Sequence, residues 1–589
     1  MENISRKVFL SQLIKLGAVV GLSANASFGT GTNNDSEFFK KVVLANNEEV
    51  AKLLQILSTD ITEIKRRLGF DLANLAAAFT EPSSRYYQQK EIISAMHKIA
   101  TFLVKSQNED GTLDIGNLAS PPDTAFILEP LCSAAIILKK VANPALDSVK
   151  NLLKTFVLKA GEGLRLGGIH TPNHRWVVSA ALARIYELFP DKKYANRIDQ
   201  WLSEGVFMDK DGHYLERSQI YAEVSDRALI TVARIMNKPQ LFAFVRKNLH
   251  MTYFYLEPNG DLVCNDSRRQ DQFISFNILD FYHDYRYMAM LDKNAEFAAI
   301  TQFIERVKGF DERVLRDLLF FFLEEPIYAQ ALPTSKEPSQ TFEKFFESSN
   351  LVRFRKNDTT ATIFGGVDFP LIIGSGRSTS PNFFTFRKGD AILKYLRFST
   401  DFFSTGYFRS HGIKKVGNKY VLNQKIEAPY YQPLPEQYKR KDANYKHSIS
   451  TDGRFWNKMD FEHRPQSNIK AIDTSIEIEE KNGKQELKFS VKGTVGVHVT
   501  IEFCFNEGGV LTGTKSIEGS TENFTVENGY GTYQAGKDSI SFGPGIFQHA
   551  KLKSLDGEMY TSHYGTLRTP GQHVYFTGLT PFEHTITIG

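Results

Sequence analysis

Cysteine and clustered basic charge are both scarce in this chain, and each scarcity excludes a class of protein. Only three cysteines, Cys132, Cys264 and Cys504, occur in 589 residues. Because they are odd in number and far apart, neither a disulfide framework nor a Cys-rich metal site is expected, and each is predicted to be a buried thiol. The 71 basic and 67 acidic residues give a net charge of only +4, with no long basic run. A nucleic-acid partner is therefore not expected.

Short motifs for metal, phosphate or nucleophilic chemistry are absent as well. The sequence has no H-E-x-x-H, phosphate-loop or nucleophile-elbow pattern, and Gly374-Ser375-Gly376 lies among predicted strands rather than before a helix. No cofactor and no metal are therefore expected. What the chain does have is 42% hydrophobic and 23% charged residues, a balance typical of folded soluble proteins.

The first residues resemble an export signal. Ser5-Arg6-Lys7-Val8-Phe9-Leu10 is similar to a twin-arginine motif with lysine in place of the second arginine, a short apolar stretch follows, and Ala24-Asn25-Ala26 offers a cleavage site. The apolar stretch is too short to span a bilayer. We expect residues 1–26 to be removed, which leaves a periplasmic chain without a membrane anchor. The alternative is a weakly amphipathic terminal helix.

Residues 37–330 show helical periodicity, with apolar side chains at three- and four-residue steps. The predicted helices are Glu48–Arg67, Glu91–Ser106, Thr124–Lys140, Ser148–Lys159, Asn173–Phe189, Tyr194–Ser203, Ser218–Met236, Pro239–His250, Phe273–Leu291, Ala295–Lys308 and Glu312–Glu324. So many helices joined by short loops predict helix pairs that close into an α/α toroid.

The pattern changes after residue 330. Ala331 to Pro338 is rich in proline and polar residues and is predicted to be a linker. Asn482-Gly483 lies between two alternating segments, Ser475–Glu480 and Gln485–Val491, which predicts a hairpin with a type I′ turn. Residues 340–589 are expected to form an antiparallel β-sandwich, so the chain is predicted to be an α+β protein of two large domains.

The stretch Thr171-Pro172-Asn173-His174 predicts a helix start, because threonine suits the N-cap and proline suits the first helical position. Asn173 and His174 would then lie at the positive end of the helix dipole. An anion binds well there, and a histidine is kept neutral and available as a base. Plain capping of the helix explains the same residues equally well.

Two further segments carry polar residues before predicted helices. Glu216 and Tyr221 follow an Asp-Gly turn, with Tyr221 near the start of a helix, although a core tyrosine is the simpler interpretation. Arg268 and Arg269 lie in a polar loop and could hold a carboxylate in a bidentate manner. Ion pairing within that loop, for example to Asp266, is the alternative.

This order of features resembles the heparinase II/III-like and alginate-lyase-like polysaccharide lyases. The shared features are the leader, the toroid, Asn-His at a helix start, Asp-Gly-x-Tyr-x-Glu followed by tyrosine, and the late sandwich. The resemblance implies cleavage of a uronic-acid-containing glycan by β-elimination, with catalytic roles for Asn173, His174 and Tyr221. The substrate-binding residues would be Arg175, Glu216, Arg217, Arg268 and His411.

β-Elimination makes these residue types intelligible. The C5 proton of a uronate is weakly acidic until the carboxylate charge is neutralised, which Asn173 and an arginine would do. His174 or Tyr221 would take the proton, and Tyr221 would protonate the departing O4. The implied partner is an anionic polysaccharide or oligosaccharide.

One segment departs from the family. Relatives carry a His-rich motif early in the sandwich, where this chain has Thr379-Ser380-Pro381-Asn382. His411, in a neighbouring loop, is the histidine that would take its place. A divergent lyase acting on another uronate linkage, such as rhamnose–glucuronate, would fit this departure.

Two other functions remain open. A toroid glycoside hydrolase, such as an unsaturated-uronyl hydrolase, would use loop carboxylates, for which Asp110, Asp114 and Asp123 are the candidates. A non-catalytic glycan-binding protein would use the same fold without cleaving the glycan.

Overall fold

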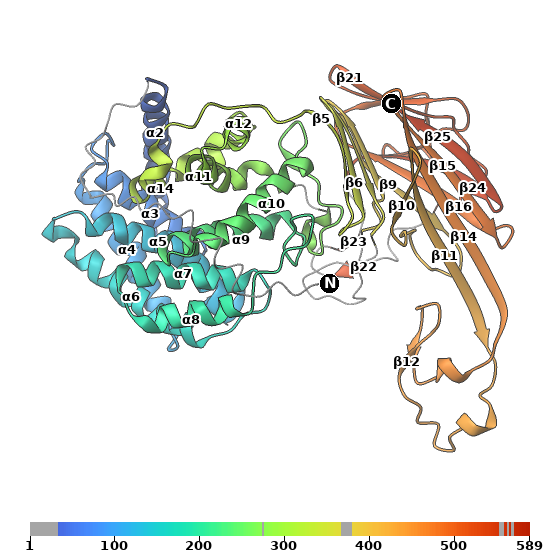
Figure 1. Ribbon diagram of the computed structural model, residues 1–589, viewed down its shortest axis with the longest axis horizontal. Helices are drawn as coiled ribbons and strands as arrows, with labels where there is room; N and C mark the ends of the chain where they lie inside the picture. The colour runs from blue at the N-terminus through green and yellow to red at the C-terminus, as the bar shows by residue number, and fades with distance from the viewer. Residues whose placement is uncertain (1–32, 274–275, 367–379, 553–558, 562–564, 567–569) are drawn as a thin grey trace, which may run out of the picture.

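A helical unit and a β unit follow each other along the chain (Figure 1). The computed structural model describes residues 33–273, 276–366, 380–552, 559–561, 565–566 and 570–589. The expected export signal lies outside these residues and stays a prediction. Within them, the α+β architecture of toroid and sandwich is confirmed.

The helices alternate between an inner ring and an outer layer. Their bounds are α2 (Asn33–Ile56), α3 (Arg67–Thr80), α4 (Lys90–Ser106), α5 (Pro121–Lys139), α6 (Asp147–Leu166), α7 (His174–Leu188), α8 (Lys192–Ser203), α9 (Gln219–Ile235), α10 (Phe242–Tyr255), α11 (Tyr282–Asp292), α12 (Ala295–Ile304), α13 (Phe310–Arg313) and α14 (Leu319–Glu324). α3, α5, α7, α9 and α11 pack against one another in chain order, and α4, α6, α8, α10 and α12 cover them from outside. Because one outer helix separates each pair of inner helices, the inner helices all run in the same direction.

The sequence of each helix matches its layer. α4 buries one stripe, which includes Ile92, Met96, Ile99 and Leu103, as an outer helix must. α5 is buried on nearly all sides, and by length and composition alone it is apolar enough to cross a membrane, although most of it lies inside the toroid. α5 therefore has no exposed polar face, unlike the outer helix α4.

Three predicted helices differ from the structure. Glu48–Arg67 is wrong, because α2 ends at Ile56, and the hydroxyls of Ser58 and Thr59 bond to carbonyls of its last turn. α3 was not predicted, although Leu68, Leu72, Leu75 and Phe79 recur in it at four- and three-residue steps. The helix predicted over Phe273–Leu291 corresponds to α11, which begins only at Tyr282, after strand β4 (Phe276–Asn277) and a short 3₁₀ turn. The helix predicted over Glu312–Glu324 is divided between α13 and α14.

Two large sheets form the sandwich. In the described part of the chain one has nine strands in the order β18-β19-β24-β16-β9-β8-β7-β6-β5, and the other has eight in the order β10-β11-β14-β15-β25-β21-β20-β17. All neighbours in them are antiparallel except β19 and β24. Strands of the first sheet are β5 (Thr341–Phe346), β6 (Leu351–Lys356), β7 (Thr359–Phe364), β8 (Phe384–Lys388), β9 (Ala391–Thr400), β16 (His498–Phe505), β18 (Lys515–Ser516), β19 (Asn523–Thr525) and β24 (Gln572–Leu579). Those of the second are β10 (Ile413–Val416), β11 (Lys419–Tyr431), β14 (Gln466–Lys481), β15 (Lys484–Gly493), β17 (Val510–Thr512), β20 (Gly531–Ala535), β21 (Asp538–Gly543) and β25 (Phe582–Ile588).

The predicted hairpin joins β14 to β15. Lys481 pairs with Lys484, so the turn consists of Asn482 and Gly483, which have φ angles of 54° and 81°. Positive φ at both central residues is what a type I′ turn requires, and the prediction is confirmed.

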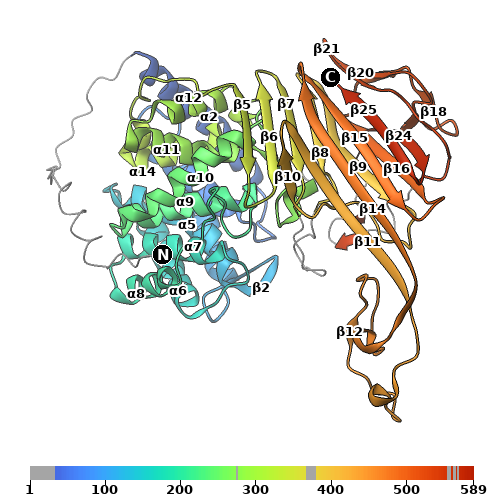
Figure 2. The same cartoon turned by 45° about the vertical axis from the view of Figure 1, so that its right-hand side comes forward.

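The toroid meets the outer face of the nine-stranded sheet (Figures 1 and 2). Arg353 of β6 is fully buried there and donates to Glu257 Oε1 at 2.9 Å, Thr362 Oγ1 at 2.6 Å and the carbonyl of Phe254 at 3.1 Å. Residues 331–338 lead to this seam without helix or strand, as predicted for the linker. The seam fixes the toroid against the sheet through buried charge.

Candidate active site

The N-terminal ends of four inner helices, α3, α5, α7 and α9, converge at one end of the ring. Arg66, just before α3, pairs with Asp123 in the first turn of α5. Asn173, which precedes α7, bonds to Glu216, which lies shortly before α9. Because inner helices share one direction, the positive ends of their dipoles face a common region. Such a region suits an anionic ligand.

Four side chains form one hydrogen-bonded network in this region. The backbone N–H and Nδ2 of Asn173 donate to Glu216 Oε2 at 3.2 and 2.7 Å. Arg269 pairs with the other oxygen of Glu216 and donates from Nη2 to the phenol oxygen of Tyr221 at 3.2 Å. Its guanidinium also lies 4.2 Å from the centre of the Tyr221 ring. The network therefore joins the start of α7 to the first turn of α9.

His174 lies beside this network as the first residue of α7. Burial is the main cause that lowers its pKa from 6.5 to about 4. The nearby charge of Asp123 raises the pKa, while His170, Arg269 and Arg66 lower it further. Its Nδ1 is buried without a hydrogen-bond partner. At neutral pH the imidazole is uncharged, so it can accept a proton.

Asp123 faces His174 from α5 and is held by three neighbours. Ser120 Oγ and Asn117 Nδ2 donate to its Oδ2 at 2.6 and 3.1 Å, and Arg66 binds its Oδ1. Burial alone would raise the pKa of Asp123, but these three donors lower it below its usual value. The carboxylate is therefore charged and fully engaged.

The remaining predicted residues are dispersed. Arg175 forms an ion pair of 2.9 Å with Glu204, the residue that follows α8, and its guanidinium stacks on the ring of Trp176. Arg217 is buried and donates to the carbonyl of Ser348 at 3.3 Å. The side chain of the exposed Arg268 donates to the carbonyl of Leu215 at 3.1 Å and its backbone N–H donates to the carbonyl of Glu216 at 3.2 Å, whereas Arg269 pairs with the Glu216 carboxylate. His411 is exposed just before β10, and its backbone N–H donates to the carbonyl of Asn423.

Two residues of the site escaped the sequence analysis. Arg66 falls in the last turn of the predicted helix Glu48–Arg67, whereas in the structure it directly precedes α3, so its place at a helix start was not anticipated. Arg269 was considered only as a member of a loop pair, and nothing local distinguishes it from Arg268. Their partners lie 57 and 53 residues away, which makes both contacts properties of the tertiary fold.

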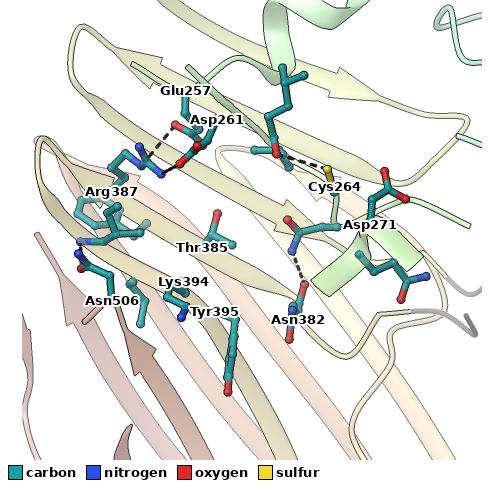
Figure 3. A pocket seen from close by; sticks show the side chains of 17 residues that line it. Glu257, Asp261, Cys264, Asp271, Asn382, Thr385, Arg387, Lys394, Tyr395 and Asn506 are labelled. Atoms are coloured by element: carbon teal, nitrogen blue, oxygen red, sulfur yellow. Dashed lines mark hydrogen bonds and ion pairs between the residues drawn. The ribbon is translucent and has the colours of Figure 1, made fainter. Parts of the chain in front are cut away.

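A cavity lies at the seam between toroid and sandwich, and none of the predicted site residues lines it. Its volume is about 340 Å³, and Figure 3 shows Asp261 and Arg387 on one side and Asp271, Asn382 and Lys394 around the rest. We do not place the chemistry there, because the converging helix ends and the neutral histidine lie elsewhere. The two places are linked by Asp271, whose Oδ2 accepts bonds at 3.0 Å from the side chain and backbone at the start of α9. No group of three or more His, Cys, Asp or Glu side chains in the described chain could hold a metal ion.

Comparison with known proteins supports the fold. By sequence, the chain matches no protein-family model and no curated protein. By structure, it is similar to a xanthan lyase from Paenibacillus, with a TM-score of 0.58, 11% identity, and coverage of 95% of this chain and 58% of that one. It is also similar to a chondroitin AC lyase from Streptomyces coelicolor A3, with a TM-score of 0.51, 11% identity, and coverage of 96% of this chain and 80% of that one. The chain thus shares the toroid-and-sandwich fold of these proteins and spans little more than half the length of the first.

Proposed function

We propose that this chain is a polysaccharide lyase that cleaves a uronic-acid-containing glycan by β-elimination. The observation that carries the proposal is the network of Asn173, Glu216, Arg269 and Tyr221 beside a neutral histidine at the converging helix ends. Xanthan lyase and chondroitin AC lyase, which share the fold, are named for this class of activity. A uronate in this chain is our inference from the site.

Each residue has a distinct role in the proposed reaction. The helix dipoles and Arg269 would neutralise the uronate carboxylate, and the neutral imidazole of His174 would take the C5 proton. The C4–O4 bond then breaks as the C4–C5 double bond forms. Tyr221, whose phenol oxygen accepts a bond from Arg269, would donate its proton to the departing O4. Glu216 would act as a positioning residue that holds Asn173 and Arg269 in place.

The loop carboxylates favour this reaction over hydrolysis. A glycosidase acid needs a carboxyl group with a raised pKa. Bonds from Ala119 N–H and then Asn108 lower the pKa of Asp114, and the donors around Asp123 lower that of Asp123. Asp110 accepts bonds from Thr112 N–H and Oγ1 at 2.9 and 2.6 Å, as a turn carboxylate does.

Ultraviolet absorbance of the new double bond tests the proposal. The native chain is incubated with uronate polymers and with rhamnose-capped glucuronides, beside Tyr221→Phe and the matched variant Tyr186→Phe, which changes a half-buried tyrosine on α7. We expect rising absorbance that Tyr221→Phe abolishes and Tyr186→Phe retains. New reducing ends without absorbance would instead favour a hydrolase, and binding of the glycan without any product would favour a glycan-binding protein.

A further inference from the structure

A small lobe extends from the end of the long β11–β14 hairpin. It comprises residues 432–465, between Tyr431 at the end of β11 and Gln466 at the start of β14, and we call it the arm. Within it lies a short two-stranded ladder of β12 (Ser448–Ile449) and β13 (Trp456–Asn457). Figures 1 and 2 both show the arm, labelled at β12, standing clear of the toroid and of the two sheets.

The arm is held in shape by its own contacts. Phe461 and Leu434 are only 5% and 6% exposed, and the ring of Tyr431 lies 5.0 Å from that of Phe461. The phenol oxygen of Tyr431 accepts a bond from the backbone N–H of Thr451 at 2.8 Å, and Arg464 donates to the carbonyls of Met459 and Gln432. A segment with its own small core presents its outward side chains in a fixed arrangement.

Those outward side chains are aromatic to an unusual degree. Trp456 is 71% exposed and Phe455 is 51% exposed, although tryptophan is ordinarily among the more buried residues. His447 lies 5.2 Å from the Trp456 ring, and Tyr438, itself 39% exposed, stacks on His463 at 3.9 Å. Flat, exposed rings on a preformed lobe can stack against the apolar faces of sugar rings.

Positive charge is interleaved with these rings. The arm carries seven Lys and Arg residues against five Asp and Glu residues. Most of its arginines are ion-paired within the arm, as Arg440 is with Asp442 and Arg454 with Asp452. The exposed Lys441 and Lys446, by contrast, form no ion pair with any described residue. A polymer of anionic sugars would supply both the missing counter-charge and the stacking partner.

We propose that the arm is a second binding site for an anionic polysaccharide, separate from the candidate active site. The choice of a uronate polymer as its ligand rests on the proposed function, whereas the existence of the site rests on the exposed rings and unpaired lysines. A second copy of this chain is a poorer occupant, because two arms brought together would place Lys441 and Lys446 against like charges.

Affinity electrophoresis tests the arm directly. Gels containing alginate, chondroitin sulfate or xanthan are compared with gels containing neutral dextran or single-stranded DNA. All variants carry Tyr221→Phe, so that the polymer is not cut during the run. We expect Trp456→Ala to weaken retardation by an anionic polysaccharide about tenfold, as loss of an aromatic anchor does. We expect a loss of about the same size from the double variant Lys441→Ala/Lys446→Ala, which removes the unpaired positive charges. The control Tyr530→Ala removes a ring of similar exposure, 57%, outside the arm and should migrate like its parent.

Each result decides for or against the arm. Unchanged retardation in the arm variants, or no retardation of the parent by any uronate polymer, would overturn the proposal. If DNA retards the parent as strongly as the polysaccharide does, and the arm variants weaken both, the arm binds polyanions in general. If sedimentation shows a dimer that the arm variants abolish, and no polymer is bound, the arm serves self-association. If the arm variants weaken polysaccharide binding but the native chain gives no rise in ultraviolet absorbance with any polymer, the proposed binding site on the arm stands while the lyase proposal fails.

Discussion

Replacing Arg353 with methionine tests how the toroid is fixed to the sandwich. The guanidinium is fully buried and makes three hydrogen bonds, two of which cross the seam, to the carboxylate of Glu257 and to the carbonyl of Phe254. Methionine keeps the length of the stem and removes the charge. Glu257 would then remain buried, with Arg387 at 3.9 Å and the hydroxyl of Thr360 as its partners at the seam.

The size of the effect follows from the charge left behind. Removing one partner of a buried ion pair costs about 3–5 kcal/mol where the other charge is left uncompensated, and the remaining contacts of Glu257 with Arg387 and Thr360 place this variant toward the lower end of that range. For a large domain this corresponds to a fall in melting temperature of roughly 6–20 °C. The double variant Arg353→Met/Glu257→Gln should recover part of the loss, since it removes the stranded carboxylate.

Differential scanning calorimetry measures this loss, with Arg313→Ala as the control. Arg313 pairs with Asp280 at 2.9 Å, but the two side chains are 50% and 34% exposed, so its removal should cost less than about 1 kcal/mol. If Arg353→Met melts no earlier than Arg313→Ala, or if the double variant is less stable than the single one, the buried charge does not stabilise the seam in the way we infer.

Three further predictions concern the site and the interior of the ring. Glu216→Gln should lower kcat about a hundredfold with a smaller change in KM, because Arg269 and Asn173 lose the carboxylate that holds them. The control Arg175→Ala should leave kcat and KM within about twofold of the native values. If steady-state kinetics show the same loss of kcat for both variants, Glu216 is not a positioning residue. Because burial lowers the pKa of His174 to about 4, kcat/KM measured against pH should fall on the acid side only as pH approaches that value. A fall centred at 6.5, the ordinary pKa of histidine, would exclude His174 as the base. Asp284 is buried with both oxygens unpartnered, and burial first, then its acidic neighbours, raises its pKa well above the usual range. The folded chain therefore favours the protonated form of Asp284, so the free energy of unfolding falls as pH rises above the ordinary carboxyl pKa. Because asparagine does not titrate, Asp284→Asn should flatten the fall in melting temperature between about pH 5 and pH 8.

Local signals predicted the parts of the fold that depend on nearby residues. Thr171-Pro172 marks the start of α7 to within a few residues, and Asn482-Gly483 marks a hairpin, because helix entry and tight turns depend on the residues that make them. Amphipathic outer helices such as α4 are found for the same reason. The inner helix α3 has apolar residues at helical spacing as well, but no exposed face opposite them, since the ring buries it on nearly every side.

Long-range choices could not be predicted in the same way. Arg268 and Arg269 are adjacent and chemically identical, yet the side chain of Arg269 pairs with the Glu216 carboxylate while that of Arg268 donates to the carbonyl of Leu215, because the loop backbone aims successive side chains in different directions. Arg175 directly follows the Asn-His pair, and the helix turns it toward Glu204 instead of the site. The sequence therefore indicated the region of the site, while the identity of its cations required the fold.

The shared direction of the inner helices has a consequence for how this protein tolerates change. The positive potential where α3, α5, α7 and α9 begin comes largely from peptide groups, which no side-chain substitution deletes and no pH in the working range titrates. Arg66 and Arg269 can accordingly be tied to carboxylates without making that end of the ring repel an anion. In the proposed lyase, loop residues around this end of the ring can be exchanged to suit a different sugar, while the preference for negative charge follows from the path of the backbone.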